Sequence, residues 1–115
     1  MKVLKKKAIK MLKRAQFSKI YNKGLFFANK HLVIYIFKQN SDNINVYGIS
    51  VSKKIGKAVL RNRMRRLIKE SLRLLQHDIK KGYNIIVVAR SSENKNFEAT
   101  DASLKKLLKK ADILL

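Results

Sequence analysis

The sequence predicts a small α+β fold, an α/β sandwich in which helices pack against one four-stranded mixed sheet. Short apolar runs rich in β-branched and aromatic residues, at 32–37 (LVIYIF) and 84–89 (NIIVVA), are typical of strands. Around them lie stretches whose apolar residues recur every three or four positions, as in amphipathic helices. A length of 115 residues fits one domain with a modest core, so residues 1–115 are interpreted as a single domain in the order α-β-β-β-α-β-α.

The first half of the chain supplies one helix and three strands. Residues 1–10 are rich in lysine and are predicted to form a loose basic arm. Phe17, Ile20 and Tyr21 recur at helical spacing before Gly24, so a short helix is predicted over 14–23. A short edge strand is predicted at 25–28, and strands at 32–37 and 46–51. Because 39–45 (QNSDNIN) has turn chemistry, these last two strands are expected to pair as a hairpin.

The second half begins with the main helix, predicted over 57–76. At about 100° per residue its residues fall into two opposite sectors. The core sector holds Leu60, Met64, Leu67, Ile68, Ser71 and Leu75, and the cationic sector holds Asn62, Arg65, Arg66, Lys69 and Arg73. Val59 lies on the cationic side, which this simple wheel does not explain.

The run at 84–89 is apolar on both faces, which indicates an interior strand. Strand, helix and strand in this order form a βαβ unit with parallel strands. Asn96 can cap a last helix with a stripe of apolar side chains from Phe97 to Ala111.

Charge is the strongest compositional signal. The chain has 28 Lys and Arg against seven Asp and Glu, a formal net charge of +21. Such an excess repels itself in a compact domain, so an anionic partner is expected: nucleic acid, a membrane surface or an acidic protein. There is no cysteine, no run long enough to span a membrane and no apolar signal-peptide core at the start. A cytoplasmic location is therefore expected.

The sequence offers no catalytic constellation. His31 and His77 lack acidic or thiol neighbours at ligand spacing, apart from Asp78, and are interpreted as surface or core-edge histidines. The carboxylates are scattered, and there is neither a phosphate-binding glycine loop nor a dinucleotide fingerprint. No catalytic residue and no metal site is predicted on this chain.

The cationic helix face is the best candidate site. A solvated face normally mixes both signs of charge, whereas this one has only Glu70 at its edge. Its arginines can grip phosphate with two parallel hydrogen bonds. Asn62 adds no charge, so a sugar, a base edge or a backbone group is its expected partner. Phe17, Tyr21 and Tyr35 either pack helix on sheet or stack single-stranded bases.

The stretch VSKKIGKAVLRNRMRRLIKE resembles the protein component of bacterial ribonuclease P. The match to the family's KxGxAVxRN segment and RNR motif is gapless and rests on Lys54, Gly56, Ala58, Val59, Arg61, Asn62, Arg63, Arg65 and Arg66. The segment AQFSKIYNKG, the LVIYIF strand and the IIVVAR strand also follow the family's order of elements. The resemblance spans about residues 12–112, with lysine at 69 where the family often has arginine and tyrosine at 21 where phenylalanine is frequent.

The resemblance implies a function and a site. Ribonuclease P removes the 5′ leader of precursor tRNA, and in the bacterial enzyme the RNA subunit is the catalyst and uses Mg²⁺. This chain would then be the accessory subunit, with the ribonuclease P RNA and the precursor tRNA leader as partners and neither membrane nor DNA expected. The family's contacts with the catalytic RNA carry over onto Lys53, Lys54, Arg61, Asn62, Arg63, Arg65, Arg66 and Lys69. Its leader cleft carries over onto Phe17, Tyr21 and Tyr35.

The resemblance also implies a left-handed βαβ crossover, against the general preference for right-handed ones. Two alternative functions stay open at this point. One is a basic ribosomal or nucleoid protein without an enzymatic role. The other is a membrane-surface binder, which the aliphatic core face of the main helix disfavours because such a helix would carry bulky aromatics there.

Overall fold

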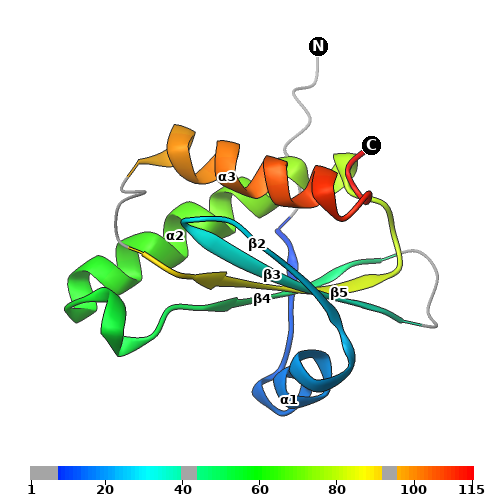
Figure 1. The fold of residues 1–115 in the computed structure, drawn as a ribbon, viewed down its shortest axis with the longest axis horizontal. Coiled ribbons are helices and arrows are strands. Elements are labelled where there is room, and N and C mark those ends of the chain that lie inside the picture. Colours follow the sequence, from blue (N-terminus) through cyan, green and yellow to red (C-terminus); the bar gives the residue numbers. More distant parts are fainter. Residues whose placement is uncertain (1–7, 40–43, 92–95) are drawn as a thin grey trace.

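A computed structural model describes residues 8–39, 44–91 and 96–115 of the chain. These residues form one sheet with helices on both faces (Figure 1). The strands lie in the order β1-β4-β5-β3-β2, where β1 is Lys10–Met11, β2 Leu25–Ala28, β3 Leu32–Lys38, β4 Val46–Ser50 and β5 Tyr83–Ala89. The prediction of an α+β fold with a mixed sheet is confirmed.

Three α-helices pack on the sheet. They are α1 (Arg14–Lys23), α2 (Ala58–Leu75) and α3 (Phe97–Lys110), with single 3₁₀ turns η1 (Lys53–Ile55) before α2 and η2 (Gln76–Asp78) after it. Helices α2 and α3 cover one face of the sheet, and α1 lies alone on the other (Figure 1). As predicted, Asn96 caps α3, accepting a hydrogen bond from the Ala99 amide through Oδ1 at 2.8 Å.

The predicted hairpin between 32–37 and 46–51 is wrong. Strand β3 pairs antiparallel with β2 and β5, whereas β4 pairs parallel with β5 and β1. Strand β5 therefore lies between β3 and β4. It is apolar on both faces and buries Ile85, Ile86 and Val87 completely, so the interior of the sheet is where it loses most contact with water. The turn chemistry at 39–45 marks a reversal of the chain without fixing which strand becomes the neighbour.

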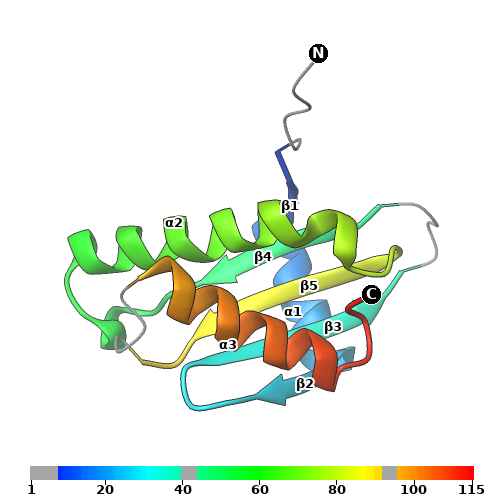
Figure 2. The same cartoon turned by 90° about the horizontal axis from the view of Figure 1, so that it is seen from above.

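The connection from β4 through α2 to β5 is left-handed. In Figure 2, with α2 toward the viewer, β4 and β5 both point to the left and β5 lies below β4. A right-handed connection would place β5 on the other side of β4. The expectation drawn from the family resemblance is confirmed.

The last residues of the predicted N-terminal arm lead into the sheet. Residues 1–7 of the predicted loose arm lie outside the described residues, but Ile9 is buried and Lys10 opens β1, which pairs with β4 at Val46 and Tyr47. The sheet therefore has five strands rather than four. The lysine-rich composition of 1–10 gives no strand signal, because the two buried apolar residues that flank the strand, Ile9 and Leu12, are separated by the exposed Lys10 and Met11.

Two apolar clusters hold the layers together. The larger lies between the sheet and the two helices α2 and α3, and its centre includes Ile68, Leu72, Leu104 and Leu108. The smaller lies under α1 and consists of Leu12, Ile20, Val46 and Ile86, with aromatic rings packed around it. Because α1 follows β1 at one edge of the sheet and precedes β2 at the other, it crosses the whole face and divides it in two.

Candidate nucleic-acid interface

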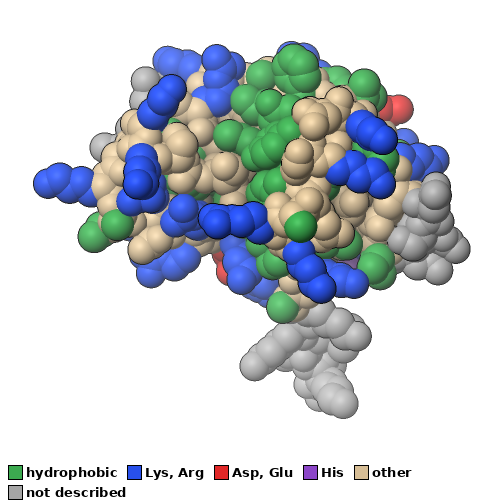
Figure 3. All heavy atoms as spheres, turned by 90° about the horizontal axis from the view of Figure 1, so that it is seen from below, with side chains coloured by type: hydrophobic (Ala, Val, Ile, Leu, Met, Phe, Trp, Pro, Cys, Tyr) green, Lys and Arg blue, Asp and Glu red, His purple; other side chains and the backbone are tan. Residues whose placement is uncertain are grey.

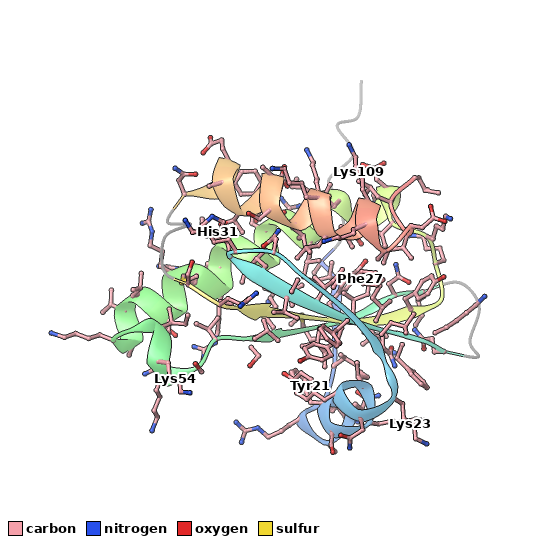
Figure 4. All side chains as sticks on the ribbon, in the orientation of Figure 1. Tyr21, Lys23, Phe27, His31, Lys54 and Lys109 are labelled. Atoms are coloured by element: carbon pink, nitrogen blue, oxygen red, sulfur yellow. The ribbon has the colours of Figure 1, made fainter. Side chains whose placement is uncertain are left out.

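The cationic stripe predicted on the main helix is largely exposed. Lys53 and Lys54 lie on η1 and are both exposed. Lys54 points into solvent at the end of the molecule where α2 begins (Figure 4). The side chains of Asn62, Arg63, Arg66 and Lys69 are exposed along α2, and Arg61 and Arg65 are half-buried. Val59, which the helical wheel left unexplained, is 81% exposed on the same side.

Two arginines of the stripe also hold the local backbone. Arg61 donates from Nε to the carbonyl oxygen of Gly56 at 3.1 Å. Arg65 donates from Nη2 to the Val51 carbonyl at 3.3 Å and from Nη1 to Oδ1 of Asn62 at 3.0 Å. Asn62 thus has a partner within the protein, which orients the Arg65 guanidinium. These bonds tie the start of α2 to the end of β4.

In the part of the chain that the structure describes, the cationic stripe meets an acid at its C-terminal end, at Arg73. In the described ranges, Glu70 pairs with Arg73, which donates from Nε at 3.0 Å, while Asp101 pairs with Lys105. The hydrogen bond from Arg73 lowers the pKa of Glu70, so this carboxyl stays ionised and its charge is neutralised locally. Arg66 and Lys69 form no ion pair with a described residue, so their charge is available to a ligand.

The N-terminus of α2 adds backbone donors. Its N-cap residue, Lys57, makes no side-chain cap hydrogen bond, and the first turn carries no acid. Gly56 precedes it with φ of 149°, and a Cβ there would lie 2.9 Å from Leu60 Cδ2, so a larger residue would strain this turn. The first amides of a helix without a side-chain cap favour an anion such as phosphate.

A cleft of about 520 Å³ opens beside α1, the helix that lies on the face of the sheet opposite α2 and α3 (Figure 1). Its walls come from β1, α1, the end of β4 and α2, namely Met11, Leu12, Arg14, Phe17, Tyr21, Ile49, Ser50, Val51 and Arg65. Tyr21 lies between α1 and the sheet (Figure 4). Its ring meets Tyr35 edge to face at 4.8 Å, and Phe17 lies 6.1 Å from Tyr21. The three aromatic residues predicted to bind bases are therefore in contact as one half-buried cluster.

The cleft brings the two predicted groups of residues together. Arg65, predicted from the family resemblance to contact the catalytic RNA, lines the cleft with Phe17 and Tyr21. Arg14 on α1 lines it too and was missed, because a single arginine three residues before Phe17 carries no distinctive signal. Figure 3 shows this face of the molecule, where Lys and Arg side chains surround an apolar band and few acidic side chains are visible.

Two further residues contact the aromatic cluster and were not singled out from the sequence. Gly48 on β4 lies directly beneath Phe17, since a Cβ at this position would stand 2.6 Å from Phe17 Cζ. Phe26 on β2 is 65% exposed and its ring lies 5.9 Å from Tyr35, so it extends the aromatic cluster to the edge of the sheet. An aromatic residue in a predicted edge strand is the signal that could have identified it.

The histidines play no part in this cleft. His31 lies at the turn between β2 and β3 (Figure 4), where its Nδ1 is 3.1 Å from Ser91 Oγ. Within residues 8–39, 44–91 and 96–115, no three His, Asp or Glu side chains come together as they would around a metal ion. The helices of the same ranges include none with the length and apolarity to cross a membrane.

The fold and the cationic, aromatic site define a small basic α+β protein of the nucleic-acid-binding class. The family model described as Ribonuclease P matches residues 5–112, and the chain belongs to the ribonuclease P protein family. The ribonuclease P protein component of Clostridioides difficile is 54% identical over 103 residues, which cover 88% of this chain and 90% of that protein. The corresponding protein of Thermoanaerobacter sp. is 42% identical over 111 residues, which cover 96% of this chain and 95% of that protein.

Solved structures agree with the sequence comparisons. The RNase P protein of Staphylococcus aureus superimposes with a TM-score of 0.83 at 36% identity, covering 95% of this chain and 100% of that one. The RNase P protein of Thermotoga maritima superimposes with a TM-score of 0.79 at 32% identity, covering 88% of this chain and 96% of that one. These comparisons do not favour the ribosomal or nucleoid alternative.

Proposed function

We propose that the chain is the protein subunit of ribonuclease P, binding the catalytic RNA through the cationic stripe and the 5′ leader of precursor tRNA in the aromatic cleft. The observation that carries this proposal is the position of Arg65, which belongs to the stripe and also lines the cleft. A protein with this geometry can hold two RNA molecules side by side. The family relationship supports the ribonucleoprotein as the setting.

The two parts of the site suit different RNA contacts. Exposed arginines and lysines on η1 and α2 form a rigid row that can neutralise phosphates of a folded RNA and release its counterions. Half-buried rings in the cleft offer faces and edges on which unpaired bases stack, irrespective of sequence. Mature tRNA has no leader, so filling the cleft would favour precursor over mature tRNA.

In this proposal the chain supplies binding and orientation, and the catalytic groups belong to the RNA subunit. Magnesium ions are expected at the RNA, where they would stabilise charge on the phosphate that is cut. The protein's contribution is electrostatic, since its cations lower the repulsion between two polyanions at assembly. We place this ribonucleoprotein in the cytoplasm.

The direct test is cleavage of a precursor tRNA at low Mg²⁺ by a bacterial ribonuclease P RNA, with and without the protein, and by the protein alone. Leader removal should be stimulated only when RNA and protein are both present. Phe17→Ala should weaken binding of precursor more than that of mature tRNA, whereas Lys106→Ala, on the outer face of α3, should leave the preference unchanged. Absence of stimulation, together with tight binding to ribosomal RNA or duplex DNA, would refute the proposal.

A further inference from the structure

A second groove lies on the other side of α1. Two adjoining hollows of about 330 and 170 Å³ share Gln39 and Asn84 and run between α1 and the beginning of β5. The described residues that line them include no acid. Helix α1 lies between this groove and the aromatic cleft described above, and Met11 of β1 lines both.

The two sides of α1 carry different chemistry. Arg14, Phe17 and Tyr21 line the aromatic cleft, whereas Lys13, Gln16 and Lys19, spaced by three residues, line the second groove. Lys10 and Lys38 stand at the rim from β1 and β3. Cations in such a row, with no acid among the described lining residues, suit a run of phosphates.

The floor of the second groove offers polar and aromatic contacts. Asn84 faces α1 from β5, where its neighbours across the sheet are Phe37 and Val46. The Oδ1 atom of Asn84 is buried and has no hydrogen-bond partner among the described residues, an arrangement that costs stability unless a ligand uses this amide. The half-buried Phe37 ring lies beside it, with Lys19 Nζ 5.3 Å from the ring centroid.

We propose that this groove is a second binding site for single-stranded RNA, in which lysines contact phosphates while the Asn84 amide binds a base edge next to Phe37. The inference rests on the proposed function in taking RNA as the ligand, but it concerns the side of α1 that the leader cleft does not use. An amide oxygen without a donor pairs with the exocyclic amino group of cytosine, adenine or guanine. Uracil can donate its N3–H to the same oxygen, so the amide is expected to bind a base edge without selecting one base.

The RNA in this groove can come from the catalytic RNA or from a distal part of the leader, and the experiment separates the two. Lys13→Ala/Lys19→Ala removes two cations from the groove. The control Lys106→Ala/Lys109→Ala removes the same charge from α3, on the opposite side of the sheet (Figure 4). Affinities of the full-length protein are measured over a range of salt for the catalytic RNA alone and, in the holoenzyme, for precursors with short and long leaders.

Loss of two phosphate contacts should lower the slope of log affinity against log salt by about 1.4 for single-stranded RNA, relative to the control. A loss confined to the catalytic RNA identifies it as the ligand. A loss confined to long leaders identifies the distal leader. Salt slopes equal to those of the control for all RNAs would overturn the proposal. Stimulation of cleavage of a short-leader precursor would still test the proposed function separately.

Asn84→Val gives a second and independent readout. If Asn84 has a purely structural role, removing its unsatisfied amide should keep or raise the melting temperature and leave RNA binding unchanged. We expect the melting temperature to hold while the affinity of the free protein for single-stranded oligocytidylate falls severalfold. An unchanged affinity in a folded Asn84→Val variant would refute the assignment of the amide.

Discussion

Removing Arg66 and Lys69 together should reduce the salt dependence of binding to the catalytic RNA. Both side chains are exposed on α2 and form no ion pair with a described residue, so each is assigned one phosphate contact. Arg61 and Arg65 are unsuitable for this test, because they also hold backbone carbonyls and their loss would disturb the fold. Each lost contact should lower the slope of log affinity against log salt by about 0.7 to 0.9.

For Arg66→Ala/Lys69→Ala the slope should therefore fall by about 1.4 to 1.8. Between about 50 and 200 mM salt, the wild-type protein should lose roughly tenfold more affinity than the variant. Filter binding or fluorescence anisotropy across this range measures both slopes. Lys106→Ala/Lys109→Ala controls for net charge, and a slope indistinguishable from that of this control would refute the assignment of the stripe.

Three other substitutions test the packing. Gly48→Ala places a methyl group against Phe17, so precursor selectivity should fall with a stability loss of about 1–3 kcal/mol; an unchanged selectivity contradicts this. Asn29→Ala removes three hydrogen bonds, to two turn amides and the Ser103 carbonyl, and should lower the melting temperature by on the order of 10 °C, which calorimetry checks. Burial raises the pKa of Tyr47, so its contribution to stability is complete below pH 10 and declines as pH rises through the folded-state pKa; denaturant titrations of Tyr47→Phe should show less alkaline loss than wild type.

Patterns that depend on one element alone were predictable from the sequence. The wheel for residues 57–76 placed Met64 and Ile68 toward the core, and both are buried. The run at 84–89 was expected inside the sheet because both of its faces are apolar, and β5 is indeed flanked on both sides. In each case a single periodicity decides the environment of the residue.

Patterns that depend on neighbours were not predictable in the same way. Pairing of β3 with β4 followed from the polar turn between them, but the apolar strand β5 displaces β4 from that position. Arg65 was placed opposite the core, yet the wheel has no information on the cleft that β4 and α1 form around its guanidinium. The second groove was missed for the same reason, since Lys13, Gln16 and Asn84 come together only when α1 crosses the sheet.

Helix α1 is joined at each end to an edge strand of the sheet. With 10 residues it is too short to be stable alone. Strand β2 follows it at one end, and the two-residue strand β1 precedes it at the other. Because β1 is the shorter of the two strands, local unfolding at this end should cost less free energy than unfolding of the sheet. Backbone amides of β1 and α1 should therefore exchange hydrogen faster than those of β5. Local unfolding at β1 would change the width of the aromatic cleft without disturbing the cationic stripe on α2. Affinity for the leader could then vary while affinity for the catalytic RNA stays constant.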